Sequence, residues 1–201
     1  MVGTDLSPIQ PSWIPANLAF EVDDVEAPWT RAPGSVDYIH MRDLGRAIDD
    51  WPALLGQCLA ALRPGGLVEI TDTTAAHAPA GEVGREFAAL LGAGYARRRR
   101  AIAHDFPALL TAAGFVGLAE RLARLPVGVW PLQPQLKELG RQWRDCLVAG
   151  LEGQALAVLT RELGWSKAEV DVLVANMRRE LLARQAMRVT RICSWVARKP
   201  L

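Results

Sequence analysis

The segment that decides the fold runs from Val36 to Ile70 and reads VDYIHMRDLGRAIDDWPALLGQCLAALRPGGLVEI. Residues 36–40 read as a strand that follows a Pro-Gly-Ser turn. Residues 51–62 predict an amphipathic helix, with Asp50 as its N-cap and an Arg-Pro-Gly-Gly run as its stop. Residues 67–70 read as a second strand. A strand, a helix and a strand at this spacing imply a parallel sheet and an α/β fold.

The same alternation extends in both directions, and we expect a single domain over residues 1–201. The section 124–187 is expected to form a mostly helical cover within it, in which Ser166 and Glu169 have the spacing of a capping box. The remaining strands are expected at residues 1–4, 18–22, 115–122 and 189–196. The remaining helices are expected at 82–95, from Asp105 to before Gly114, around 136–151 and around 156–163.

The bulk composition is that of a soluble globular protein, with 50% hydrophobic residues and a net charge of +1. That balance argues against a nucleic-acid or membrane partner, and we expect a cytoplasmic protein, with the nucleus as the second compartment. Cys58, Cys146 and Cys193 lie far apart among apolar residues, which predicts small buried thiols and no metal site. The run Arg97–Arg100 is expected to be a solvated face at a helix end.

Acidic residues follow two neighbouring strands at the edge where parallel sheets bind ligands. Asp5 ends the first strand, and an acid there accepts hydrogen bonds from ribose hydroxyls. Asp23 and Asp24 end the second strand, where a carboxylate accepts from an adenine amino group. Taken singly, each acid is more readily explained as a turn cap or a solvated loop residue, and it is the placing of both at neighbouring strand ends that favours a ligand. His40 lies near the carboxyl end of the third strand but receives no catalytic role, because no partner for it is evident.

Several runs resemble the fungal methyltransferases of secondary metabolism, called LaeA-like, which are related to trans-aconitate methyltransferases. The resemblance covers nearly the whole chain. The runs are Gly3–Pro11, Phe20–Glu26, Asp37–Arg42, Leu62–Glu69, Pro126–Pro131, Leu136–Gly140, Leu163–Trp165 and Arg198–Pro200.

The resemblance implies a Rossmann-like class I methyltransferase fold that uses S-adenosyl-L-methionine to methylate a small acceptor, such as a secondary metabolite or organic acid. It gives the ribose to the strand end at Asp5 and the adenine to the one at Asp23. The segments around Tyr95 and from Trp130 to Met187 would cover the acceptor. Catalysis by positioning leaves the catalytic residue unknown. The full set of expected cofactor-binding residues is Asp5, Leu6, Asp23, Asp24, Val25, His40 and Met41.

Two departures from the family pattern stand out. Relatives carry a central strand and a GxGxG-type turn before the position of Gly3, so the chain is expected to be N-terminally truncated. Weak cofactor binding, exposed strand edges and poor solubility follow. The run Gly92–Gly94 is expected to be a packing feature and no substitute. Near the last strand, Met187–Val189 stands where relatives often carry a His and an aromatic residue.

Three functions therefore stay open from the sequence. The first is a methyltransferase, which is favoured by the acids at Asp5 and Asp23. The second is a non-catalytic methyltransferase-like interaction module with a protein partner, which the absent glycine turn favours. The third is a nicotinamide-dependent Rossmann enzyme, against which the family resemblance speaks.

Overall fold

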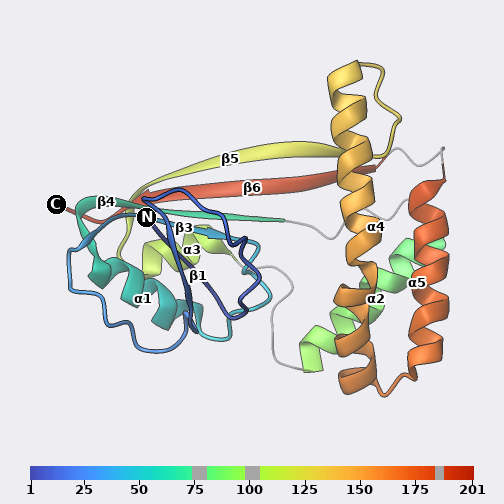
Figure 1. Ribbon diagram of the computed structural model, residues 1–201, viewed down its shortest axis with the longest axis horizontal. Coiled ribbons are helices and arrows are strands. Elements are labelled where there is room, and N and C mark those ends of the chain that lie inside the picture. The colour runs from blue at the N-terminus through green and yellow to red at the C-terminus, as the bar shows by residue number, and fades with distance from the viewer. Residues whose placement is uncertain (74–80, 98–104, 184–187) are drawn as a thin grey trace.

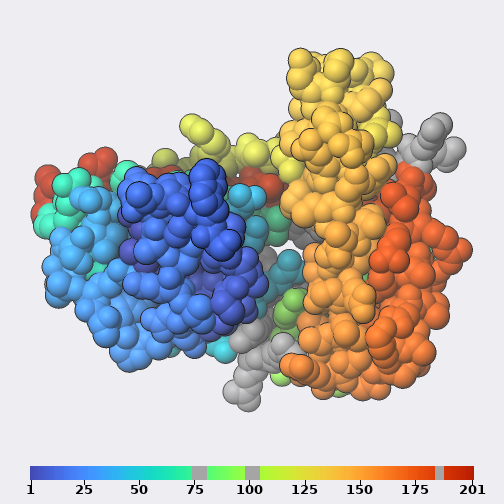
Figure 2. All heavy atoms as spheres, in the orientation of Figure 1, coloured from blue at the N-terminus to red at the C-terminus, as the bar shows by residue number. Residues whose placement is uncertain are grey.

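The computed structural model describes residues 1–73, 81–97, 105–183 and 188–201. Two lobes lie side by side in Figure 1, joined along one side by a long two-stranded ribbon. One lobe holds the parallel strands and two helices, and the other is a helical bundle. The space-filling view in Figure 2 shows an opening between the lobes beneath the ribbon.

The strands form two separate sheets, and this division positions the candidate site. β1 (Val2–Asp5) and β2 (Ala19–Val22) pair in parallel as a two-stranded sheet. The second sheet has the order β3-β4-β6-β5. β3 (Val36–Arg42) and β4 (Leu62–Thr73) are parallel, as the sequence predicts. β6 (Arg188–Arg198) lies antiparallel to both β4 and β5 (Val116–Val127).

The first core lies between one face of the larger sheet and two helices, α1 (Trp51–Ala61) and α3 (Phe106–Ala112). Asp50 caps α1 by accepting a hydrogen bond from the amide of Ala53 at 2.9 Å, which confirms the predicted start. The largest fully buried side chains of this core are those of Leu54, Leu55, Leu62, Val68, Ile70 and Leu110.

The second core joins α2 (Glu82–Arg97), α4 (Pro134–Leu163) and α5 (Lys167–Leu182). The predicted capping box at the start of α5 is present: the Glu169 amide donates to the Ser166 hydroxyl, and the Ser166 amide donates to the Glu169 carboxylate. A side chain at Gly94 would overlap Cγ1 of Val158. The run Gly92–Gly94 therefore serves close packing of α2 on α4, as expected.

Two expectations about the helical lobe are wrong. The separate helices expected around 136–151 and 156–163 form the single 30-residue helix α4. Its buried positions Leu147, Leu151, Ala155 and Val158 form one stripe across the join, so packing outweighs the helix cost of the glycines there. Cys146, expected to be buried, is exposed, whereas Cys58 and Cys193 are buried.

Two arginines from runs noted in the sequence lie at the ends of described segments. Arg97 ends α2 and donates to the carbonyl of Glu162, whereas Arg98–Arg100 lie outside the described residues. Arg188, at the start of β6, is 3% exposed. Met187, the residue before it, lies outside the described residues. None of the helices in the described ranges combines the length and apolar character needed to cross a membrane.

Candidate functional site

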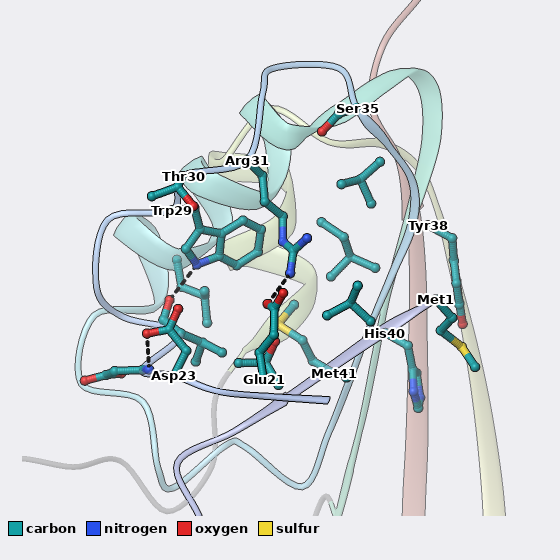
Figure 3. Close-up of a pocket in the computed structure, with 18 of the residues that line it drawn as sticks. Met1, Glu21, Asp23, Trp29, Thr30, Arg31, Ser35, Tyr38, His40 and Met41 are labelled. Atoms are coloured by element: carbon teal, nitrogen blue, oxygen red, sulfur yellow. Dashed lines mark hydrogen bonds and ion pairs between the residues drawn. The ribbon is translucent and has the colours of Figure 1, made fainter. Parts of the chain in front are cut away.

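A cavity of about 900 Å³ lies between the two sheets. β1 supplies Val2, Gly3 and Thr4 on one side, and β3 supplies residues 36–41 on the other. Each of these strands has one hydrogen-bonded neighbour, β2 and β4 respectively, so the second backbone edge of each is unpaired by any described strand. The cavity therefore separates two open edges of parallel strands (Figure 3).

The acid pair predicted from the sequence lies on this cavity, and its geometry is fixed by the backbone. Asp23 accepts a hydrogen bond from the amide of Asp24 at 2.8 Å, and Asp24 accepts from the amide of Glu26 at 2.9 Å. Both side chains are exposed, and neither forms an ion pair within the described part of the chain. They leave unneutralised negative charge at the carboxyl end of β2.

Asp5 and Leu6 lie differently from the other predicted residues, because neither lines the cavity. Asp5 is half-buried, and its Oδ1 accepts a hydrogen bond from the amide of Ser7 at 2.9 Å, as in a turn cap. The backbone brings the two strand ends together, since the amide of Asp23 donates to the carbonyl of Asp5 at 3.1 Å. Leu6 is 70% exposed.

Val25 belongs to a loop that is tied to α1. The indole N–H of Trp29 donates to the carbonyl of Val25 at 2.9 Å. The Trp29 amide donates to Gln57 Oε1 at 2.7 Å, and Gln57 Nε2 donates back to the carbonyl of Ala27 at 3.2 Å. These bonds hold Val25 half-buried against the first core. The sequence did not predict this role of Gln57, because nothing in the local pattern of a helix indicates that a Gln side chain binds a distant loop.

His40 and Met41 both line the cavity but lie on opposite faces of β3, since consecutive strand residues alternate. Met41 is buried in the first core. His40 is exposed and stacks on Tyr38, with ring centroids 6.4 Å apart. The Tyr38 hydroxyl donates to Glu69 at 2.5 Å, and desolvation together with that carboxylate raises the pKa of Tyr38 to about 12. Tyr38 itself is about half exposed.

An ion pair that the sequence did not reveal joins two residues of the cavity lining, Glu21 and Arg31. Arg31 Nη2 lies 2.9 Å from Glu21 Oε2, and Figure 3 shows the two side chains pointing toward one another. Arg63 and Asp37 form a second pair at 2.9 Å. Ten residues separate Glu21 from Arg31, and no local periodicity links them. Asp23 and Asp24 are thus the carboxylates of the lining that form no ion pair with the described residues.

The arrangement offers hydrogen-bond acceptors and an apolar wall, with little apparatus for covalent or metal chemistry. No three His, Cys, Asp or Glu side chains gather as metal ligands would among the described residues. The exposed cysteine lies on α4, away from the lining residues. Such a site suits a neutral or cationic ligand that donates hydrogen bonds at the carboxyl ends of β1 and β2.

Comparison with known proteins agrees with this architecture. The chain is 37% identical over 209 residues to methyltransferase pytC of Aspergillus terreus, covering all of this chain and 64% of that protein. It is 36% identical over 214 residues to the secondary metabolism regulator LAE1 of Cochliobolus heterostrophus, covering 69% of that protein. The chain thus spans less than two thirds of the length of the first relative and slightly more than two thirds of the length of the second.

Solved structures show the same fold at low sequence identity. A Haemonchus contortus phosphoethanolamine N-methyltransferase 2, in complex with S-adenosylhomocysteine, superposes with a TM-score of 0.50 at 20% identity, over 92% of this chain and 38% of that one. The YcgJ protein of Bacillus subtilis gives a TM-score of 0.52 at 13% identity, over 100% and 82%. The methyltransferase domain model matches residues 1–121. With its Rossmann-like class I fold, the chain belongs to the methyltransferase domain family.

Proposed function

We propose that the chain carries the nucleoside-binding part of an S-adenosyl-L-methionine-dependent methyltransferase that acts on a small-molecule acceptor. The observation that carries this proposal is the meeting of two acidic strand ends, at Asp5 and Asp23, on neighbouring parallel strands beside the cavity. Family membership and the relatives that are named methyltransferases support it.

The residues present fit the nucleoside half of this cofactor. Asp5 lies at the strand end beside the cavity, and its second carboxylate oxygen, Oδ2, accepts no hydrogen bond from the described residues, which leaves it available to ribose hydroxyls. Asp23 and Asp24 supply acceptors for an amino group, and Val25 supplies a half-buried apolar wall. Their net negative charge also favours a cofactor whose sulfonium is positive.

The methionine half has a poorer fit. Met41 and His40 reach the cavity from β3, but the rest of that wall is the open backbone edges of β1 and β3. No glycine-rich turn followed by a helix N-terminus lies against the cavity in the described residues, so the backbone donors that such a turn offers to a carboxylate are absent there, and Arg31 in the lining is paired with Glu21. Nucleoside binding without firm methionine binding predicts a weak complex for this chain alone.

The protein's part in methyl transfer is to bind and to orient. The cofactor supplies an electrophilic methyl group when bound. The acids at the ends of β1 and β2 fix the nucleoside, while the helical lobe, facing the opening between the lobes, covers the acceptor (Figure 2). A reaction that depends on in-line alignment gains most from such positioning, so no single side chain needs to act as acid or base.

The test is calorimetric titration of S-adenosylhomocysteine into the purified chain and into Asp24→Asn, which removes the charge and keeps the shape. Asp43→Asn is the matched control, because Asp43 is an exposed acid outside the cavity with a φ of 55° that Asn tolerates. We expect weak binding that Asp24→Asn weakens further and Asp43→Asn leaves unchanged. Equal affinity in all three would contradict the assignment of the site.

A second function is favoured by a specific observation. The open edges of β1 and β3 are a feature of interaction modules that bind a partner through backbone pairing. A non-catalytic, regulatory module would keep the fold without binding the cofactor. A folded sample that shows no heat with S-adenosylhomocysteine, and none of the dependence on Asp24, would favour this alternative. In either case we propose a cytoplasmic or nuclear location.

A further inference from the structure

A second open edge lies on the far side of the larger sheet, remote from the cavity. β5 is the outer strand in the order β3-β4-β6-β5, and β6 is its sole strand neighbour in the described part of the chain. Every residue from Val116 to Arg124 is exposed. In Figure 1 this edge runs along the top of the ribbon, free of covering elements until α4 crosses its end.

The exposed edge carries both leucines and charges, because Leu118 and Leu122 lie among Glu120, Arg121 and Arg124. Proteins protect edge strands with prolines, bulges or charged side chains. Here the one irregularity lies at Val116–Ala119, and the first proline of the strand is Pro126, so residues 119–125 form a regular strand. Leu118 and Leu122 are 39% and 47% exposed.

The α4 end adds further exposed leucines. The first turns of α4 project past the edge of β5 in Figure 1. Leu132, before the helix, is 95% exposed, and Leu136 and Leu139 within it are about 40% exposed. Exposed leucines therefore lie both on the edge strand and at the projecting end of α4.

The charges on β5 identify the partner as a second copy. Glu120, Leu122 and Arg124 share one face of the strand, where they lie opposite Trp195, Cys193 and Arg191 of β6. Glu120 and Arg124 are each two residues from Leu122, on either side. We propose that β5 pairs antiparallel with β5 of a second chain around a two-fold axis at Leu122. Each Glu120 then lies opposite the other chain's Arg124.

Other registers of the antiparallel pair are less favourable because of the residues that they bring opposite one another. A two-fold axis perpendicular to the sheet keeps each side chain on its own face of the sheet, so the axis lies midway between two copies of the same residue. An axis at Glu120, Arg121 or Arg124 would place that charged residue opposite its own copy, which destabilises an antiparallel pair. An axis at Ala123 would oppose Arg124 to Leu122. The axis at Leu122 leaves no like charges opposite one another and stacks the two leucines.

Sedimentation velocity of the full chain, over a micromolar concentration series, tests this proposal. We expect a dimer for the natural sequence. Arg124→Glu, which opposes two acids at two places per dimer, should raise the dissociation constant about tenfold or more. The exchange Glu120→Arg with Arg124→Glu should restore the natural value. Arg121→Glu is the matched control, because Arg121 faces the other side and lies opposite Ala123.

The rescue separates the interface from folding. Glu120 also accepts a hydrogen bond from the indole of Trp195 at 3.2 Å, which the charge exchange does not restore. Recovered dimerisation in the exchange variant therefore reports the intermolecular pair and not the fold. A chain that stays monomeric throughout, or one whose association is the same in Arg124→Glu as in the natural sequence, overturns the proposal. The latter result would locate association at the open edges of β1 and β3.

Discussion

Replacing Gln57 by Ala tests how the cavity wall is held. Gln57 accepts a hydrogen bond from the Trp29 amide and donates one to the carbonyl of Ala27. At about 0.5–1.5 kcal/mol per bond, its loss should lower the free energy of unfolding by about 2 kcal/mol. For a chain of this size, the midpoint of thermal unfolding should fall by roughly 4–8 °C. Urea unfolding followed by circular dichroism gives the free energy directly.

A second variant sharpens this prediction. Gln57→Glu keeps the oxygen that accepts from Trp29 but sets a carboxylate oxygen against the carbonyl of Ala27, so at neutral pH we expect a loss at least as large as that of Gln57→Ala. Gln142→Ala is the control: Gln142 is exposed and bonds only within α4, to Glu138 at 2.8 Å. If Gln57→Ala cost no more than Gln142→Ala, the two bonds would not stabilise the loop, and the reasoning would fail.

Three further predictions concern the rest of the fold. Burial raises the pKa of both the Cys58 and Cys193 thiols to about 12 from 9. The stability that these buried neutral thiols contribute is therefore complete below pH 9 and is lost as the pH rises toward 12. Urea unfolding should show a lower free energy of unfolding at pH 10.5 than at pH 8, and Cys58→Ala should reduce that difference. Ser166→Ala should cost about 1 kcal/mol in the same assay, through loss of the cap on α5. Gly94→Ala should destabilise the fold by about 1–3 kcal/mol, because the added methyl group meets Val158 of α4. Gly153→Ala, with open space around it, should stabilise the fold by about 0.5–1 kcal/mol. The opposite order of the two effects would refute the packing argument.

The parts of the fold that the sequence predicted are those with local causes. The N-cap at Asp50 and the capping box at Ser166 each need residues within one helical turn. The parallel pairing of β3 with β4 follows from a strand–helix–strand unit of ordinary length. The continuity of α4 did not follow, because it depends on α2 and α5 covering one long stripe, and those partners are distant in sequence.

The candidate site divides in the same way. Asp23 and Asp24 were predictable because a strand end fixes their position on the sheet edge. The ion pair between Glu21 and Arg31 and the bonds of Gln57 depend on loop paths that periodicity does not encode. His40 and Met41 were both predicted to bind the cofactor, but strand alternation sends their side chains to opposite faces of β3, whose open edge lies on the cavity.

The stability of the smaller sheet gives a further reason to expect weak cofactor binding, even with the proposed binding residues in place. β1 and β2 are short and largely exposed, and they pair with no other described strand. Two isolated strands are marginally stable in water, so this pair, which carries Asp5 and Asp23, belongs to the least stable part of the molecule. Cofactor binding must then also order that unit. If its binding-competent arrangement were populated at one part in ten, the apparent dissociation constant would rise about tenfold with every contact intact. An element that pairs with the open edges of β1 and β3 would raise that population, and affinity would increase without any change in Asp5, Asp23 or Asp24, the acids proposed to bind the cofactor.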